Sequence, residues 1–270
     1  MSLTRTDYII FAVLFVLALF IWLRNTLWMT TSDDTLPILV AIPLFYWIGA
    51  PWIFRPDPQP LSINKLTLTV VLFLVGIGIN STLILAIGWT LLLWTWLSAR
   101  LVPEKLGQVK KLLVLPLMAF PWISLDADRI GWWFRLSGAW ATAGFFSFFG
   151  SDVTREGTII VVNGTPISVE VACAGLNTLQ SMLIAGTLVA YLTLGNTDRY
   201  WWNLPVLIGM SWLANTVRII VITFAAVKIS KQFATGAFHQ IGGWAVLVLM
   251  FCMCWFIFYI QEPKQQRTGP

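Results

Sequence analysis

Charged residues are scarce in this chain, and histidine is almost absent. Only 11% of the 270 residues are Asp, Glu, Lys or Arg, whereas 58% are hydrophobic and the mean hydropathy is +0.79. This composition excludes a soluble globular domain and indicates an integral membrane protein. The single histidine, His239, excludes a multi-histidine metal site, and the three cysteines, Cys173, Cys252 and Cys254, form neither a disulfide framework nor a metal pattern. The sequence therefore predicts no metal and no cofactor.

The net charge of +5 does not indicate a nucleic-acid partner. The basic residues are scattered among short loops and form no patch interleaved with aromatic residues. The sixteen tryptophans are typical of membrane proteins, because indoles gather where lipid headgroups meet hydrocarbon. We therefore expect membrane lipids, and no nucleic acid, around this chain.

Apolar runs predict about eight transmembrane helices in one all-α polytopic domain covering residues 1–270. A span needs about 20 mostly apolar residues. The run 66–98 is too long for one crossing, so we place a tight turn at "INST" around Asn80. The run 112–125 is short and contains Pro116 and Pro121. The predicted spans are residues 8–23, 36–53, 66–80, 82–98, 112–125, 176–194, 204–226 and 244–260.

The basic residues place both termini in the cytoplasm. With the N-terminus inside, most Lys and Arg residues lie on the inner side, as the positive-inside rule requires, and most acidic residues lie on the outer side. An eight-span path also keeps the basic loop "RLVPEKLGQVKK" and the basic tail "PKQQR" on the same face. Residues 126–175 then lie outside the cytoplasm.

Residues 126–175 are the one sizeable segment outside the predicted spans, and they predict a small extracytoplasmic cap. Its first part, "RIGWWFRLSGAWATAGFFSFFG", mixes Arg, Trp and Phe with small residues, which predicts a helix or two lying in the membrane interface. Its second part, "TIIVVNGTPISVEV", has two β-prone runs around Asn163 and Gly164, a strong hairpin signal. The predicted hairpin leads directly to Cys173.

Cys173 lies just before the predicted sixth span, at a helix N-terminus on the outer side. The free N–H groups and the helix dipole at such a terminus stabilise a thiolate. At helical spacing, Cys173 shares a face with Asn177 and Gln180. The alternative, a cysteine that only packs, fits the position equally well. We assign Cys252 and Cys254, which have no polar neighbour in "MFCMCWFIF", to packing.

Arg218 lies within the predicted seventh span, where an ionised side chain costs roughly 2.5 to 3.5 kcal/mol at the helix centre. Ser211, Asn215 and Arg218 are spaced i, i+4, i+7 and share one helical face. We therefore expect the guanidinium to point into the helix bundle. The alternative is an arginine that reaches the outer lipid headgroups. Charges within a membrane span usually have a function, so Arg218 is a candidate site residue.

His239 lies at the outer start of the predicted eighth span, on the same side of the membrane as Cys173 and Arg218. A thiol nucleophile needs an acid or base that titrates near neutral pH, as histidine does. Arginine stays charged and can stabilise a thiolate or the oxyanion of a tetrahedral intermediate. An isolated histidine is more often structural, but the three residues together predict a catalytic set.

Three further residues are candidates for substrate binding or support of this set. Glu170 could orient His239 or pair with Arg218, although a solvent-facing strand residue is an equal alternative. Asn177 and Asn215 lie on the helices that carry the predicted set, and helix–helix hydrogen bonding is the alternative for both.

Three motifs resemble the exosortase/archaeosortase family of membrane cysteine transpeptidases: "EVACAGLNTLQS" around Cys173, "NTVRI" around Arg218 and "HQIGGW" around His239. The resemblance covers about residues 165–245, while the first four spans match only in hydropathy. The histidine is more similar to the bacterial exosortases than to the archaeal enzymes, and Ala174 stands where many members have serine. The resemblance implies a bacterial inner membrane and exported substrates that end in a Pro-Glu-Pro-type motif, a transmembrane helix and a basic tail.

The sequence thus predicts a membrane cysteine protease or transpeptidase that cleaves a C-terminal sorting signal through a Cys173 thioester. The product is then released by water or transferred to a glycan or lipid acceptor. Two alternatives stay open. One is a transporter or scaffold without covalent chemistry, in which Arg218 binds an anionic solute. The other is a membrane acyltransferase that carries a lipid thioester on Cys173.

Overall fold

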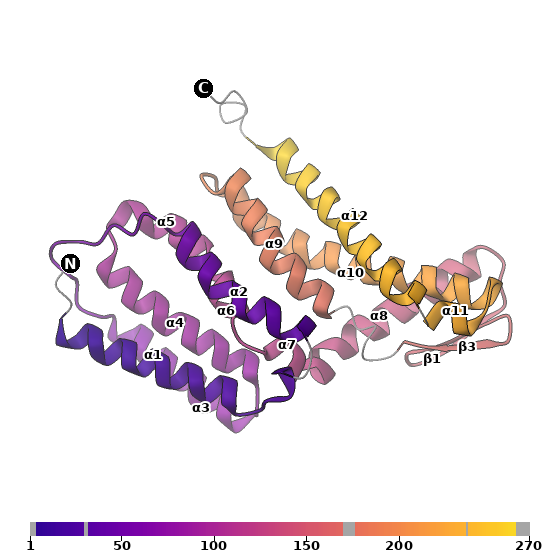
Figure 1. Cartoon of the computed structure of the whole chain (residues 1–270), viewed down its shortest axis with the longest axis horizontal. Coiled ribbons are helices and arrows are strands. Elements are labelled where there is room, and N and C mark those ends of the chain that lie inside the picture. Colours follow the sequence, from indigo (N-terminus) through magenta and orange to yellow (C-terminus); the bar gives the residue numbers. More distant parts are fainter. Residues whose placement is uncertain (1–3, 30–31, 170–175, 236, 263–270) are drawn as a thin grey trace. The chain divides into compact units, whose positions relative to one another are not determined.

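The computed structural model describes residues 4–29, 32–169, 176–235 and 237–262, and these are mostly helical with one small sheet (Figure 1). The chain forms two compact units. The first unit comprises Met1–Asp126 and Gly195–Tyr200, and the second comprises Ala127–Leu194 and Trp201–Pro270. The elements of the proposed site lie in the second unit.

The first unit is built from helices. Two of them, α3 and α4, form a hairpin whose turn has Asn80 in the left-handed region, with φ of 56°. This confirms the tight turn expected there, because asparagine adopts positive φ more readily than most residues. The helices are α1 (Arg5–Leu23), η1 (Leu27–Met29), α2 (Ser32–Ile48), α3 (Ile63–Gly78), α4 (Thr82–Arg100), α5 (Pro103–Lys111), α6 (Val114–Met118) and α7 (Trp122–Leu125).

A buried ion pair joins the start of α1 to the end of α4. The Asp7 carboxylate is fully buried and accepts hydrogen bonds from Arg100 Nε and Trp96 Nε1, both at 2.7 Å. Its second oxygen accepts from the Thr4 backbone N–H at 2.9 Å, which completes a capping box at the start of α1. Removing one partner of such a pair is costly because the other charge stays buried and unpaired. The contact therefore holds the ends of the two helices together.

The prediction of a single helix over residues 112–125 is wrong. This segment forms two short helices, α6 and α7, and Pro121 lies between them with ψ of 34°. Proline has no N–H and prevents a continuous helix across residues 119–121. The apolar side chains of the segment are nevertheless buried, including Leu115, Met118 and Phe120.

Residues 195–200 belong to the first unit because Lys111 binds their backbone. Lys111 Nζ donates to the carbonyl oxygens of Gly195 at 2.8 Å and Thr197 at 2.9 Å, and the Tyr200 hydroxyl donates to the Lys111 carbonyl. Burial lowers the pKa of Lys111, and the nearby Asp198 carboxylate partly offsets that change.

The second unit contains the predicted cap and three long helices. The cap consists of α8 (Ala127–Phe148), a single helix, followed by a three-stranded antiparallel sheet in the order β1-β2-β3. The strands are β1 (Val153–Glu156), β2 (Ile159–Val162) and β3 (Thr165–Ser168). The helices that follow are α9 (Leu176–Leu194), α10 (Arg199–Lys228), α11 (Lys231–Thr235) and α12 (Ala237–Gln261).

The predicted hairpin is confirmed. Asn163 and Gly164 connect β2 to β3 with φ of 49° and 77°, and positive φ at both positions is what a type I′ turn requires. The sequence did not predict β1, which pairs with β2 in the register Val153↔Val162. Because β1 is polar and largely exposed, it lacks the apolar signal that indicates a strand.

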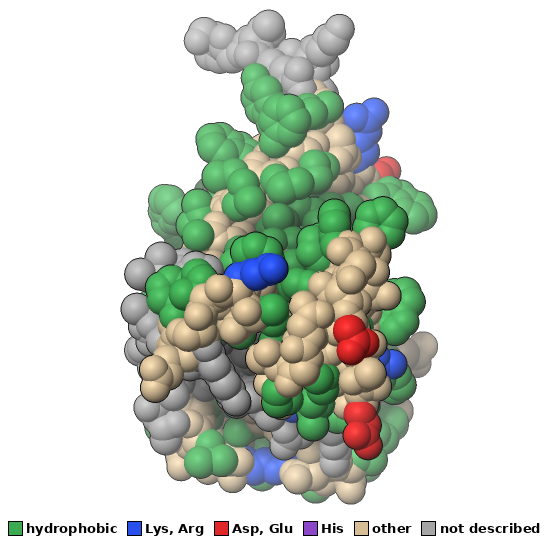
Figure 2. Space-filling view, turned by 90° about the vertical axis from the view of Figure 1, so that its right-hand side faces the viewer, with side chains coloured by type: hydrophobic (Ala, Val, Ile, Leu, Met, Phe, Trp, Pro, Cys, Tyr) green, Lys and Arg blue, Asp and Glu red, His purple; other side chains and the backbone are tan. Residues whose placement is uncertain are grey.

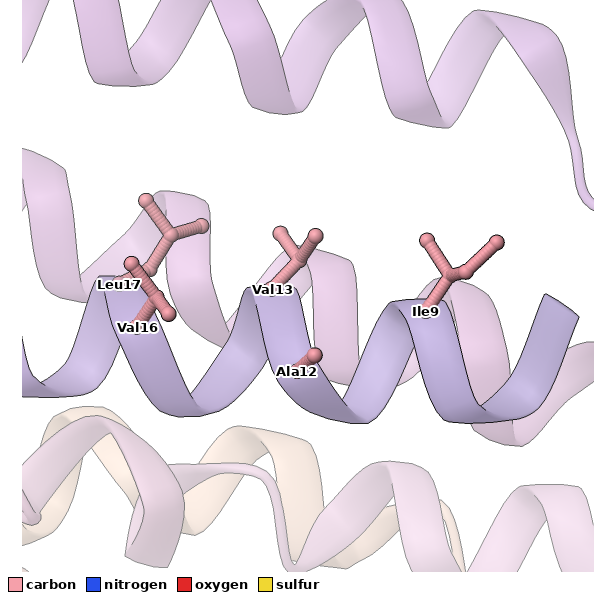
Figure 3. A pocket seen from close by; sticks show the side chains of 5 residues that line it. All are labelled: Ile9, Ala12, Val13, Val16 and Leu17. Atoms are coloured by element: carbon pink, nitrogen blue, oxygen red, sulfur yellow. The ribbon is translucent and has the colours of Figure 1, made fainter. Parts of the chain in front are cut away.

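Among the described residues, three helices are long and apolar enough to cross a membrane: α1, α4 and α10. Shorter apolar helices lie at Ile38–Ile48, Ile63–Gly78, Leu179–Leu194 and Val248–Gln261. The total of about eight spans stays a prediction. One hollow on α1 is lined only by aliphatic side chains, and Figure 3 shows Ile9, Val13 and Leu17 along it at one-turn spacing. Such a surface is expected where a helix contacts lipid.

Candidate functional site

Arg218 lies on α10 beside the last residues of the sheet. Its half-buried side chain lines a cleft with Ile167, Ser168 and Val169, at the end of β3 and just beyond it. The remaining lining comes from α10 itself: Ile219, Ile222 and Thr223. The structure therefore brings Arg218, on a helix long and apolar enough to cross a membrane, next to the strand that precedes Cys173 in the sequence.

An apolar cluster holds the sheet against two helices. Ile160, Val162 and Val169 pack with Ala139 and Phe146 of α8 and with Ile219 of α10. The ladder extends one residue past β3, because the Val169 N–H donates to the Thr158 carbonyl at 3.0 Å. Val169 is buried and Ser168 is exposed, as expected from the alternation of side chains along a strand. Hydrogen bonding and apolar packing thus hold the backbone of the third strand in place as far as Val169.

Cys173 and Glu170 lie outside the described residues. The chain is described again from Leu176, where α9 begins, so the candidate thiol belongs to the connection between the sheet and a long helix. Asn177 lies in the first turn of α9 and His239 in the first turn of α12, but their side chains also lie outside the described part. Convergence of Cys173, Arg218 and His239 stays a prediction.

The helices that carry Asn177 and His239 pack against each other. Figure 1 shows α9 and α12 side by side, and contacts between them are among the most extensive in the second unit. Gln180, one turn after Asn177, is 2% exposed. A polar side chain is therefore buried near the start of α9, as the predicted polar face of this helix requires.

The face of α10 in the two turns before Arg218 is buried, as predicted. Ser211 is fully buried and Asn215 is 1% exposed. Neither the Ser211 hydroxyl nor either amide atom of Asn215 hydrogen-bonds to any described residue. Gly138 allows α8 to approach here, because a Cβ at that position would lie 2.9 Å from Ile219 Cδ1 and 4.0 Å from Asn215 Nδ2.

A side-chain hydrogen bond joins α10 to α8. The Trp212 indole N–H donates to Ser137 Oγ at 2.9 Å, and Ser137 Oγ donates to the Trp133 carbonyl at 2.6 Å. Trp212 lies on the same helix as Arg218. This bond therefore connects the candidate arginine to the cap helix that supports the sheet.

The polar residues Ser168 and Thr223 of the cleft were not predicted from the sequence. Thr223 does not follow the spacing that relates Ser211, Asn215 and Arg218. Thr223 is fully buried, and its hydroxyl makes no hydrogen bond within the described chain. Thr223 contributes to the cleft only because β3 packs against α10 in the folded chain.

The two cysteines assigned to packing differ. Cys254 is buried, which confirms the prediction for that residue, whereas Cys252 is exposed on α12. Because successive residues on a helix point about 100° apart, two cysteines separated by one residue cannot share a face. The packing prediction is therefore wrong for Cys252.

The end of the second unit that carries the sheet has a mixed surface. Figure 2 shows hydrophobic side chains over much of this view, with acidic and basic side chains scattered among them from its upper right to its lower part. The fold and the cleft thus define a helical membrane protein with an arginine on a long apolar helix, held beside a small sheet.

The chain belongs to the transmembrane exosortase family, whose model matches residues 4–256. The match includes the first four predicted spans, so the expectation that it would be confined to about residues 165–245 was too narrow. No curated protein and no solved structure matches the chain. Family membership supports a membrane transpeptidase of the general exosortase kind.

Proposed function

We propose that this chain is a cysteine transpeptidase of the bacterial inner membrane that cleaves the C-terminal sorting signal of exported proteins. The family supports the class of reaction. The observation that carries the residue assignment is the cleft in which Arg218 lies beside Ile167–Val169, because this strand continues towards Cys173. The expected substrates end in a Pro-Glu-Pro-type motif, a transmembrane helix and a basic tail.

In the proposed reaction, the Cys173 thiolate attacks the carbonyl carbon of the scissile peptide bond. A carbon–sulfur bond forms and the carbonyl oxygen becomes an oxyanion, which the Arg218 guanidinium stabilises by charge and hydrogen bonding. The carbon–nitrogen bond then breaks, and protonated His239 gives its proton to the departing amine. The remainder of the exported protein stays on Cys173 as a thioester.

The second half of the reaction releases this thioester. Water, or an amine or hydroxyl of a glycan or lipid acceptor, attacks the thioester carbon while neutral His239 takes the proton of the nucleophile. The carbon–sulfur bond breaks and the Cys173 thiolate is restored. In this scheme Glu170 orients His239 or pairs with Arg218, while Asn177 and Asn215 support the helices that carry the reacting groups.

The proposed orientation places this chemistry on the extracytoplasmic side, with both termini in the cytoplasm. The cap, residues 126–175, would then lie over the ends of the helices that carry Arg218 and His239. A substrate held in the bilayer by its own helix would present the adjacent peptide bond at this boundary. No step requires a metal or cofactor.

The test uses a secreted reporter that carries such a sorting signal, expressed with the full chain. We expect Cys173→Ala to reduce the rate of processing by at least about a thousandfold, because the nucleophile is removed. Cys252→Ala, a change on the exposed surface of α12, is the matched control and should process the reporter normally. Full processing by Cys173→Ala would refute the proposal.

Mass spectrometry of the unaltered chain, acid-quenched during turnover to trap the adduct on Cys173, would distinguish the alternatives. A reporter peptide attached to Cys173 supports the transpeptidase, whereas a fatty acyl group supports the membrane acyltransferase. If alkylation of Cys173 has no effect while substitution of Arg218 changes the uptake of an anionic solute, the transporter alternative is favoured.

A further inference from the structure

The strand β3 has a free edge beside Arg218. It is the last strand of the sheet, and no other described strand pairs with it. In an antiparallel ladder the backbone groups of successive residues point to opposite sides. Because Val169 donates to Thr158 on the β2 side, the N–H and C=O of Ser168 point to the free side. Ser168 is exposed and lines the cleft.

Pro166 limits how far this edge can pair. It lies opposite Val161 in the ladder, two residues before Ser168, so its backbone also faces the free side. Proline has no N–H, and prolines at an edge restrict strand addition. A partner strand would therefore find a complete donor and acceptor pair at Ser168 and only an acceptor at Pro166. This places the favourable pairing at the end of β3 that continues towards Cys173.

Thr223 provides a second, independent indication of a ligand. Several helical threonines of this chain satisfy their hydroxyls with the carbonyl one turn earlier, at 2.7 to 3.0 Å: Thr69, Thr95, Thr193 and Thr216. Thr223 is fully buried, yet its hydroxyl has no such bond within the described chain. The hydroxyls of Thr90, Thr142 and Thr187 are also unbonded within the described chain, but only Thr223 of these four residues lines the cleft with Arg218 and Ser168. An unsatisfied buried hydroxyl in a cleft is suited to bind a polar group of a ligand.

We propose that the free edge of β3, beside the cleft between β3 and α10, binds the polypeptide substrate as an added strand, a role that rests on the function proposed above. The substrate backbone pairs with Ser168, and the Thr223 hydroxyl donates to a substrate carbonyl. Ile167, Ile219 and Ile222 give the cleft beside this edge an apolar lining. Recognition by strand addition uses backbone hydrogen bonds for affinity, so different exported proteins can bind through the same edge. The bound chain thereby pairs with the strand that precedes Cys173 in the sequence.

The first test compares proline substitutions at the two edges of the sheet in the full chain. Ser168→Pro removes the free N–H on β3. Arg155→Pro is the matched control, since Arg155 pairs with Ile160 and its backbone faces the free side of β1. We expect Ser168→Pro to lower the initial rate of reporter processing about five- to tenfold, by weaker substrate binding, since one hydrogen bond contributes of order this factor. Arg155→Pro should leave it unchanged.

The second test removes the hydroxyl of Thr223. Thr223→Val keeps the shape and removes the donor, and we expect a similar five- to tenfold loss, seen in KM rather than in kcat. Thr216→Val is the control on the same helix, because the Thr216 hydroxyl is already bonded to its own helix.

Photo-crosslinking separates binding from catalysis. With benzoylphenylalanine at position 168 in a Cys173→Ala chain, we expect adducts with the reporter, and none with benzoylphenylalanine at position 155. Adducts with lipid alone at position 168, or equal reporter adducts from both positions, would overturn the strand-addition proposal.

The two proposals fail in different ways. If the unaltered chain processes the reporter and both Ser168→Pro and Thr223→Val match it, the strand-addition proposal is wrong while the transpeptidase remains supported. If the unaltered chain leaves the reporter intact, the proposed function is wrong. The strand-addition proposal, which rests on that function, is then also wrong.

Discussion

Arg218 combines three properties at the scale of the single residue. It lies on an apolar helix long enough to cross a membrane, it is half-buried, and it lines the cleft at the end of β3. Lys228, on the same helix, is exposed and shows the arrangement expected of a cation that only contacts solvent or headgroups. Arg218 and Lys228 therefore provide a matched pair of cations on one helix for experiment.

We expect Arg218→Lys to lower the rate of reporter processing by roughly a hundredfold or more, because loss of an oxyanion-stabilising group costs about that much and lysine lacks the planar fork of donors. Lys228→Met should process the reporter at the normal rate. Rates measured with equal amounts of membrane-inserted protein would show the difference. Equal rates for Arg218→Lys and the unaltered chain would remove Arg218 from the proposed reaction.

The sequence predicted Arg218 and its buried face but not the other residues of the cleft. Ser211, Asn215 and Arg218 are separated by single helical turns, so periodicity alone identifies their common face. Ser168 and Thr223 approach each other only through tertiary packing between a strand and a helix, and neither stands out locally. The position of the Cys173 thiol is likewise set by tertiary contacts that periodicity does not describe.

At the scale of elements, the turns with a strong local signal were predicted correctly. Asn80 and the pair Asn163 and Gly164 adopt positive φ, which these residue types allow at low cost. The break between α6 and α7 was missed because an apolar run was weighed above Pro121. Local conformational preference was thus more informative than hydropathy at these boundaries.

A pair of glycines at the end of α3 tests how closely this helix packs on α4. A Cβ at Gly76 would lie 2.8 Å from Leu85 Cδ2 and 3.1 Å from the Leu85 backbone N, whereas a Cβ at Gly78 would meet nothing within 4 Å. We expect Gly76→Ala to destabilise the protein by about 1 to 3 kcal/mol, as overpacking does. Gly78→Ala should be close to neutral. Thermal unfolding in detergent measures both, and equal midpoints would contradict the tight contact.

At the scale of the whole molecule, the family match extends well beyond the candidate site. The family match extends over residues 4–256, and this range includes the first unit with its Asp7–Arg100 ion pair. Hydropathy predicted a helical membrane protein correctly. It did not predict the division into two compact units, because the pairing of helices depends on side-chain packing that hydropathy ignores.

Cysteine labelling tests the orientation in the membrane. Thr154 is exposed on β1, and Gly107 is exposed on α5. In a chain whose own cysteines are replaced by serine, Thr154→Cys should react with an impermeant maleimide in intact spheroplasts. Gly107→Cys should react only after the membrane is permeabilised. The opposite pattern would place the cap in the cytoplasm and contradict the proposed side of the reaction.

The cleft is assembled from distant parts of the chain, and this has a consequence during biosynthesis. The hairpin leaves the ribosome before α10, and α12 follows last. In the proposed mechanism, a nascent chain would carry its nucleophile before the oxyanion-stabilising cation and the proton donor have been made. In this scheme the chain would gain its activity only when translation and insertion are nearly complete, which protects neighbouring secretory polypeptides from premature cleavage.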